Sequence, residues 1–289
     1  MRKQYTLKWG SHRLELGERT CVMGVVNVTP DSFSDGGRFY SPEAAIDQGE
    51  KLIADGADIL DIGGESTRPF SDEVSERDEL ERVIPVIEVL AGRTGIPISI
   101  DTTKAAVARR ALEAGASIIN DVSALRVDPQ MTAVAVEFDV PVMLMHMLGT
   151  PKTMQDSPVY DDVVADIKKF LDQAVSKAVN AGIARERIII DPGIGFGKTL
   201  EHNLLLINNV FGLQTIDLPI LIGPSRKAFL RNLLKEDGVA DIPPDLPIVE
   251  TGTQAAVAVA VTRGAHIVRV HDVADTRATV KIVDAIVNA

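Results

Sequence analysis

The sequence is poor in cysteine and has no long apolar run. Its 289 residues include one cysteine, Cys21, so no disulfide can form within the chain and a reducing compartment is expected. No apolar run approaches the roughly 20 residues that a membrane span needs. The first ten residues, MRKQYTLKWG, lack the apolar core of a signal peptide. We therefore expect a cytoplasmic protein without a membrane partner.

Positive charge and metal-binding patterns are also scarce. The chain has 30 Lys and Arg against 41 Asp and Glu, a formal net charge of −11 at pH 7. This sign argues against a general nucleic-acid surface, although a local cluster of cations can still bind an anionic substrate. No HExxH or CxxC pattern is present. His146 is therefore expected to orient a loop rather than to bind a metal.

Short apolar runs recur along the whole chain. A polar–apolar alternation around a Gly-Ser turn, YTLKWGSHRLELGE, predicts a β-hairpin within residues 1–20. The eight runs that follow are CVMGVVN, DILDIG, IPISID, SIIND, VPVMLMH, RIIID, PILIG and HIVRVHD. Their near-continuous hydrophobicity is typical of parallel strands buried on both faces.

Helical periodicity fills the stretches between these runs. Gly56, Gly115 and Gly264 each stand between the end of a helix pattern and the start of an apolar run, as helix-ending glycines do. Eight strand–helix units predict an α/β fold, a (β/α)8 TIM barrel, as a single domain spanning residues 1–289. The first strand is not followed by GxGxxG, which disfavours an open dinucleotide-binding sheet.

Most of the predicted strands end in a polar residue. A helix cap or a loop hydrogen bond would explain any one of them. The whole set, with an arginine, two histidines and several carboxylates, indicates an active site at the carboxyl rim of the barrel. The residues are Asn27, Asp61, Asp101, Asn120 with Asp121, His146, Asp191, and Arg269 with His271.

Two loops after the strands carry further chemistry. DPGIGFGKT, residues 191–199, misses the P-loop pattern by one residue and is interpreted as a glycine loop that a ligand can approach. Phe196 is an isolated aromatic in this loop, without an apolar neighbourhood, and we expect a ring-stacking or lid residue rather than a core residue. GPSRK, residues 223–227, lies where barrels often bind phosphate. The alternative is that Arg226 and its neighbours begin a helix and face solvent.

An ordered set of motifs resembles the dihydropteroate synthase family. The motifs are NVTPDSFSDGG, DIGGESTRP, SIDTTK, INDVSAL, MHMLGTPKTMQ, DPGIGFGKTLEHN, SRK and IVRVHDV. The resemblance implies a (β/α)8 barrel, a homodimer and sulfonamide binding. It also implies condensation of 6-hydroxymethyl-7,8-dihydropterin pyrophosphate with p-aminobenzoate, through a pterin cation formed by C–O cleavage. The products are 7,8-dihydropteroate, a folate precursor, and pyrophosphate.

The resemblance also implies roles for residues. A pterin presents an edge of donors and acceptors, which a carboxylate, an amide and an ammonium group can read; the matching positions are Asp101, Asn120, Asp191 and Lys227. Pyrophosphate would be bound by Arg269 and His271, with Mg²⁺ on Asn27. The amine pocket would comprise Phe33, Thr67, Arg68, Pro69, Phe196 and Ser225. The implied catalytic residues are Asp35, beside the cation, with Lys227, Arg269 and His271.

Two positions depart from the family pattern. Phe70 stands where the family commonly has glycine, and Pro224 stands where it often has a small polar residue. Two other functions stay open. One is a methyltetrahydrofolate:corrinoid methyltransferase, which needs no pyrophosphate site, and the other is a pterin-binding protein without catalytic activity.

Overall fold

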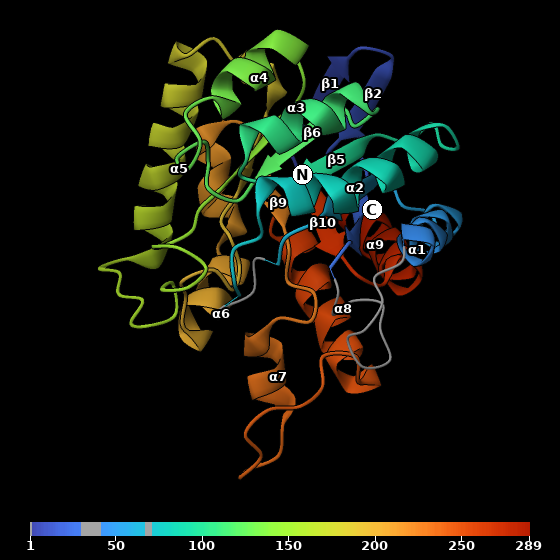
Figure 1. Cartoon of the computed structure of the whole chain (residues 1–289). Helices are drawn as coiled ribbons and strands as arrows, with labels where there is room; N and C mark the ends of the chain where they lie inside the picture. Colours follow the sequence, from blue (N-terminus) through green and yellow to red (C-terminus); the bar gives the residue numbers. More distant parts are fainter. Residues whose placement is uncertain (1, 30–41, 67–70) are drawn as a thin grey trace.

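The computed structural model describes residues 2–29, 42–66 and 71–289. A hairpin comes first, formed by antiparallel strands β1 (Tyr5–Trp9) and β2 (His12–Leu16), in which Leu7 pairs with Leu14 and both side chains are buried. His266, just before β10, reaches the Lys3 carbonyl through Nε2 at 3.0 Å. The hairpin therefore packs at the amino ends of the barrel strands, and the predicted hairpin is confirmed (Figure 1).

Eight parallel strands form the barrel, in the order β8-β7-β6-β5-β4-β3-β10-β9. A parallel bridge between Ile190 and Ile220, with Ile190 N donating to Pro219 O at 3.0 Å, joins the two ends and closes the ring. The predicted barrel is confirmed. Its strands are β3 (Cys21–Asn27), β4 (Ile59–Gly63), β5 (Ile98–Asp101), β6 (Ile118–Asp121), β7 (Val142–Met145), β8 (Ile188–Asp191), β9 (Leu221–Ile222) and β10 (Ile267–Val270).

Helices surround this ring (Figure 1). They are α1 (Pro42–Ala54), α2 (Glu76–Ala91), α3 (Ala105–Glu113), α4 (Met131–Phe138), α5 (Val163–Asn180), α6 (Leu200–Asn208), α7 (Ala228–Leu234), α8 (Pro247–Thr262) and α9 (Val273–Val287), with 3₁₀ turns at Arg185–Arg187 and Val210–Ile216. Gly56, Gly115 and Gly264 have φ of 96°, 114° and 110°, so they end α1, α3 and α8 as predicted. Within the described chain, no helix is both long and apolar enough to cross a membrane.

Backbone register sets the carboxyl rim. Asn27 lies opposite Gly63, Gly63 opposite Asp101, and Asp101 opposite Asn120, on four consecutive strands. A Cβ atom on Gly63 would lie 3.3 Å from the Asp101 Cβ, so this glycine leaves room for that carboxylate. The strand pairing thus brings together polar side chains that are up to 93 residues apart along the chain (Asn27 to Asn120).

Candidate active site

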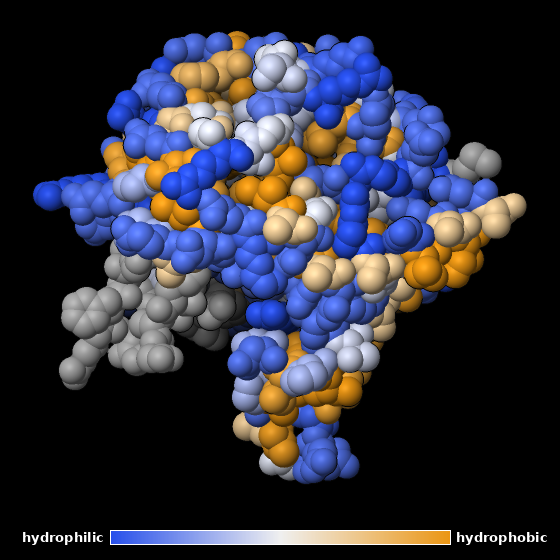
Figure 2. Space-filling view, turned by 90° about the vertical axis from the view of Figure 1, so that its right-hand side faces the viewer, coloured by the Kyte–Doolittle hydropathy of each residue, from blue (hydrophilic) through white to orange (hydrophobic). Residues whose placement is uncertain are grey.

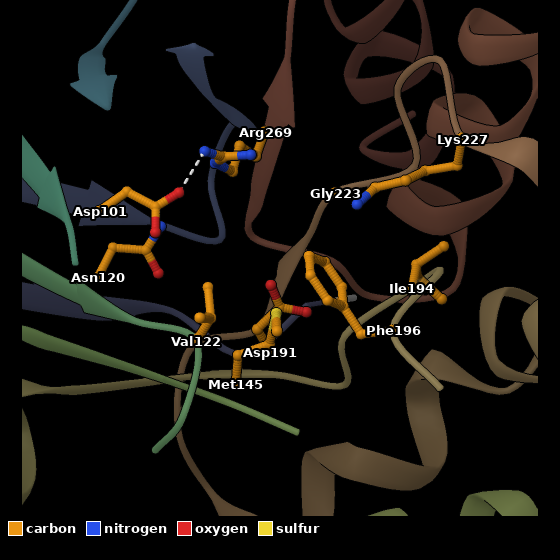
Figure 3. A pocket seen from close by; sticks show the side chains of 10 residues that line it. All are labelled: Asp101, Asn120, Val122, Met145, Asp191, Ile194, Phe196, Gly223, Lys227 and Arg269. Atoms are coloured by element: carbon orange, nitrogen blue, oxygen red, sulfur yellow. Dashed lines mark hydrogen bonds and ion pairs between the residues drawn. The ribbon is translucent and has the colours of Figure 1, made fainter. Parts of the chain in front are cut away.

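A pocket opens at the carboxyl ends of the barrel strands (Figure 3). It contains the four residues predicted to read a pterin, together with Phe196 and Arg269. Carboxylate, amide, ammonium and guanidinium groups therefore face one small space. The lining residues are Asp101, Asn120, Val122, Met145, Asp191, Ile194, Phe196, Gly223, Lys227 and Arg269.

Arg269 is held by two carboxylates. Its Nε donates to Asp61 Oδ2 at 2.6 Å, and its Nη2 donates to Asp101 Oδ2 at 2.8 Å. The same Asp61 oxygen accepts a hydrogen bond from Asn120 Nδ2 at 3.1 Å. Asp61 is fully buried. It orients both the arginine and the amide. The prediction that Asp61 ends its strand is wrong, because Ile62 and Gly63 follow it within β4.

Two carboxylate oxygens in this group lack a hydrogen-bond partner among the described residues. They are Oδ1 of Asp101 and Oδ1 of Asp61, both buried. Burial raises the pKa of Asp101, and the Arg269 guanidinium opposes that rise. A buried acceptor left without a donor costs roughly 1–3 kcal/mol. Asp101 lines the pocket, so a ligand with an N–H group along one edge would supply its missing donor.

Asp191 contributes a second carboxylate to the pocket. Its Oδ1 accepts a hydrogen bond from the Gly193 backbone N–H at 2.7 Å. Burial raises the pKa of Asp191 to about 6, while the Gly193 hydrogen bond and the Lys227 charge act in the opposite direction. The carboxyl group is therefore ionised at neutral pH and gains protons in mildly acidic solution.

Phe196 and Lys227 form one wall of the pocket. The Lys227 Nζ lies 4.0 Å from the centroid of the Phe196 ring, a cation–π contact. The expectation that Phe196 has no apolar neighbours is wrong, because the ring packs in an apolar cluster with Val122, Met145, Met147 and Met154. Gly195 has φ of +83°, and a Cβ there would lie 3.0 Å from Lys227 Cδ, so glycine makes room for the lysine.

Hydrogen bonds hold the glycine loop that carries Phe196. Gly195 N donates to Asn203 Oδ1 at 2.7 Å, and Gln155 Nε2 donates to Gly195 O at 2.9 Å. The buried Lys198 donates to Phe196 O at 2.8 Å and lies 3.1 Å from His146 Nδ1. Burial lowers the pKa of His146 to about 2, so its neutral ring accepts from Lys198. His146 contacts this loop, in agreement with its predicted orienting role.

Ser225 and His271 meet at the mouth of the barrel. Ser225 Oγ lies 2.9 Å from His271 Nδ1 and accepts a hydrogen bond from the His271 backbone N–H at 3.3 Å. Arg226 has φ of +59°, and its side chain lies 3.5 Å from Glu250 on α8. The GPSRK segment therefore directs Lys227 to the pocket and Arg226 to a neighbouring helix.

Six of the positions singled out in the sequence lie outside the described residues. They are Phe33, Asp35, Thr67, Arg68, Pro69 and the divergent Phe70.

Comparison with known proteins identifies the family of the chain. A family model described as pterin binding enzyme matches residues 23–271, which names the class that the barrel and its polar pocket define. Dihydropteroate synthases from Synechocystis sp. and Escherichia coli are 45% and 44% identical to the chain, covering 96% and 93% of it and 93% and 92% of their own lengths. The chain belongs to the dihydropteroate synthase family, and it is an enzyme of the transferase class.

Solved structures give the same result. A Yersinia pestis dihydropteroate synthase with a sulfonamide drug complex is 43% identical, with a TM-score of 0.90, covering 98% of this chain and 100% of its own. A Xanthomonas albilineans dihydropteroate synthase in complex with 7,8-dihydropteroate is 42% identical, with a TM-score of 0.85, covering 97% of this chain and 98% of its own. These relatives favour the synthase over the corrinoid methyltransferase.

Proposed function

We propose that the chain condenses 6-hydroxymethyl-7,8-dihydropterin pyrophosphate with p-aminobenzoate to give 7,8-dihydropteroate and pyrophosphate. One observation carries this proposal. A buried pocket places Asp101, Asn120, Asp191 and Lys227 around the same space, with Arg269 at its edge. A methyl-transfer reaction on a folate would leave the arginine, and the nearby His271, without an anion to bind.

The pterin ring is recognised along its polar edge. The unpartnered Oδ1 of Asp101 and the pocket-lining carboxylate of Asp191 accept from ring N–H groups. The Asn120 amide is oriented by its hydrogen bond to Asp61 and pairs with the ring edge. Lys227 donates to a ring acceptor while its stem stays against Phe196. Because Asp101, Asn120 and Asp191 are buried, a ring lacking one partner for them would lose on the order of 1–3 kcal/mol of binding free energy.

The diphosphate lies at the rim above the ring. Asp61 and Asp101 engage Nε and Nη2 of Arg269, and we assign its Nη1 to the diphosphate oxygens. His271, oriented by Ser225, is the second donor. The two carboxylates keep the guanidinium in place before the substrate arrives, which is the preorganisation that stabilises developing negative charge.

The residues at the rim fit a magnesium ion that arrives with the substrate. Mg²⁺ keeps several waters and binds through one or two protein ligands plus substrate phosphates. In the part of the chain that the structure describes, no three His, Cys, Asp or Glu side chains could hold an ion by themselves. Asn27, the last residue of β3, supplies a single amide oxygen at the rim. When bound there, the ion would neutralise charge on the departing pyrophosphate.

The reaction breaks the C–O bond between the pterin methylene and the diphosphate, and both electrons leave with pyrophosphate. The resulting pterin cation is attacked by the neutral amine of p-aminobenzoate. The C–N bond forms and the amine loses a proton to solvent or to pyrophosphate. Asp35 is assigned to the side of the cation, and the amine pocket to Phe33, Thr67, Arg68, Pro69, Phe196 and Ser225. A weakly basic aryl amine needs no strong general base, because it is already neutral at pH 7.

We further propose a cytoplasmic homodimer. Apolar side chains gather on the lower, protruding part of the molecule, where α7 and the start of α8 lie (Figure 2). Exposed apolar patches of this kind mark interaction surfaces. A second copy of the chain is the expected partner, and light scattering of the purified protein should give twice the chain mass. The side chains are Leu233, Val239, Leu246 and Ile248.

The proposed reaction is tested by formation of 7,8-dihydropteroate by the purified protein. The wild type should form it from the two substrates, whereas Asn120→Ala should bind the pterin substrate at least about tenfold more weakly, as expected for an unpaired buried group. Asn208→Ala, at an amide that pairs with Arg263 on the surface, is the matched control and should behave as the wild type. Pterin binding without product would instead identify a protein that has lost catalysis.

A further inference from the structure

Lys198 is a buried basic residue to which the proposed reaction gives no part. It lies just before Thr199, which caps α6, and it is 3% exposed. Its Nζ donates to Phe196 O at 2.8 Å and lies 3.1 Å from His146 Nδ1. Both of these partners are uncharged, because burial keeps the His146 ring neutral. Lysine is almost never this buried without a charged partner, so a specific role is indicated for it.

The lysine joins the glycine loop after β8 to the stretch that follows β7. The two segments lie in direct contact, because an added Cβ atom on Gly193 would lie 2.0 Å from His146 O and one on Gly197 would lie 2.7 Å from Leu148 Cβ. Lys198 reaches across this contact to His146 and back to the carbonyl of Phe196. It therefore fixes the loop backbone at the residue whose ring faces the pocket.

Phe196 connects Lys198 to the pocket. Phe196 and Lys227 both line it (Figure 3), and Lys227 Nζ lies 4.0 Å from the centroid of the Phe196 ring. The ring also packs in an apolar cluster with Met145 and Met147. Without the hydrogen bond from Lys198, the Phe196 backbone could move and take the ring with it. Lys227 would then lose the aromatic surface against its ammonium group.

Both protonation forms of Lys198 can make this contact. Burial lowers the pKa of Lys198 to about 7, whereas the negative charge of Asp191 acts in the opposite direction. The acceptors on Phe196 and His146 are neutral, and a lysine side chain keeps at least two N–H donors as an amine. The hydrogen bond to Phe196 is therefore retained on both sides of pH 7, and at pH 8 the uncharged amine predominates.

We propose that Lys198 is a positioning residue for the pterin substrate, which acts by fixing Phe196 in the wall of the pocket. The inference rests on the proposed function, in which this pocket binds the pterin ring. Lys198 is not one of the residues that line the pocket, so it acts through Phe196 and not by touching the ring. The diphosphate end of the substrate, assigned to Arg269 and His271, should not depend on it.

The first test is calorimetric titration of Lys198→Met and of the wild type at pH 8. The Kd for 6-hydroxymethylpterin should rise about fivefold to tenfold in the variant, the scale of one lost buried hydrogen bond. The Kd for inorganic pyrophosphate with Mg²⁺ should stay within about twofold of the wild type. Because the lysine is mostly uncharged at pH 8, the comparison measures its hydrogen bonds and not its charge.

A double-mutant cycle with Phe196→Ala separates positioning from general damage to the fold. If Lys198 acts by holding the Phe196 ring, its loss should matter little once the ring is gone. Lys198→Met should therefore raise the pterin Kd by less than about twofold in the Phe196→Ala background. A rise as large as in the wild-type background would show that Lys198 does not act through Phe196, and would overturn the inference.

Lys51→Met is the matched control, because Lys51 is exposed on α1 and pairs with Asp55 at 2.5 Å. It should bind both ligands as the wild type does. If Lys198→Met does not fold, Lys198→Gln, which is shorter and keeps an amide donor, enters the same cycle with an expected rise of at least about threefold.

An unchanged pterin Kd in a folded Lys198 variant, or a pyrophosphate Kd that rises as much as the pterin Kd, would also overturn the inference. In both cases the wild type still binds the pterin, so the proposed function stands. Absence of pterin binding in the wild type would instead overturn the proposed function, and this inference with it.

Discussion

Arg269 Nε donates a hydrogen bond to Asp61 Oδ2 at 2.6 Å, and this ion pair lies at the centre of the site. Asp61 lies on β4 and Arg269 on β10, and β3 runs between these two strands. The same oxygen accepts from Asn120. One buried carboxylate therefore links the residue assigned to the diphosphate with a residue assigned to the pterin ring. The residues assigned to the diphosphate and to the pterin ring of one substrate, Arg269 and Asn120, thus share Asp61 as a hydrogen-bond partner.

This link predicts a double defect for Asp61→Asn. The variant keeps an oxygen of similar position but loses the charge that holds Arg269. We expect a loss of about 10–100-fold in kcat/KM for the pterin substrate and a decrease of roughly 1–3 kcal/mol in the free energy of unfolding. Steady-state kinetics and urea denaturation measure the two effects.

Asp172→Asn is the control for this prediction. Asp172 pairs with Lys168 on α5 at 2.6 Å, and both side chains are partly exposed. Exposed pairs of this kind contribute about 0–1 kcal/mol. If Asp61→Asn were as mild as Asp172→Asn in both measurements, the linking role of Asp61 would be wrong.

The raised pKa of Asp191 predicts that pterin affinity depends on pH. The ring N–H groups need ionised carboxylates at Asp101 and Asp191, whose pKa values are both raised by burial. Affinity should therefore be highest well above pH 6, the pKa of Asp191, and should fall as pH decreases through it. The fall approaches about tenfold per pH unit for a single group. Calorimetric titration of a pterin analogue between pH 5 and 8 measures it, and Asp191→Asn should bind weakly with a smaller pH dependence.

The Asp191 carboxyl group also makes the free energy of unfolding depend on pH, in the direction opposite to its effect on pterin affinity. Its pKa is raised from an ordinary value of 3.8 to about 6 in the folded chain, so the folded state holds the proton more tightly. Its contribution to the free energy of unfolding is therefore present below pH 4 and is lost as pH rises through 6. Asp191→Asn should thus be as stable as the wild type, or more stable, at pH 8. A large loss of stability at pH 8 would mean that the carboxylate is structural.

Sulfonamide binding tests the amine half of the site. If Phe33, Thr67 and Pro69 bind p-aminobenzoate only after the pyrophosphate site is filled, a sulfonamide should bind tightly only when pyrophosphate and a pterin are also present. Titration with and without these two ligands measures the difference. Equal affinity in both conditions would show that the amine pocket exists in the free protein.

Much of the fold follows from local patterns. The eight Ile- and Val-rich runs are buried strands because no polar face interrupts them, and the three helix-ending glycines have the positive φ that their position required. The rim residues Asp101, Asn120 and Asp191 could also be predicted, since parallel strands place their carboxyl ends together.

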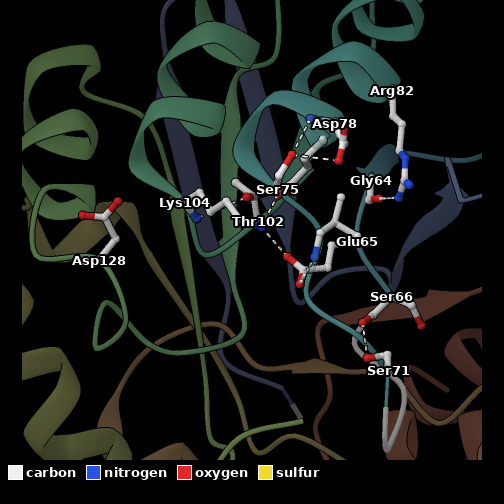
Figure 4. Close-up of polar contacts among 12 residues, drawn as sticks. Gly64, Glu65, Ser66, Ser71, Ser75, Asp78, Arg82, Thr102, Lys104 and Asp128 are labelled. Atoms are coloured by element: carbon white, nitrogen blue, oxygen red, sulfur yellow. Dashed lines mark hydrogen bonds and ion pairs between the residues drawn. The ribbon is translucent and has the colours of Figure 1, made fainter. Parts of the chain in front are cut away.

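Contacts that depend on closure of the barrel could not be predicted in the same way. The pairing of Asp61 with Arg269 joins residues 208 positions apart, and nothing in either neighbourhood selects the other. The apolar environment of Phe196 was missed because its partners, Val122, Met145, Met147 and Met154, come from other loops and strands. No local pattern predicts that Lys104 pairs with Glu65 (Figure 4) and with Glu79, because the two glutamates come from different parts of the chain.

Pyrophosphate release in the presence and absence of p-aminobenzoate tests the central claim most directly. The account predicts release that depends on the amine, matches dihydropteroate formation one for one and is suppressed by chelation of Mg²⁺. The rate of pyrophosphate release should fall roughly 10²–10³-fold in Arg269→Ala, the scale of losing one preorganised electrostatic group. Release unaffected by p-aminobenzoate, or a loss below about threefold in Arg269→Ala, would contradict it.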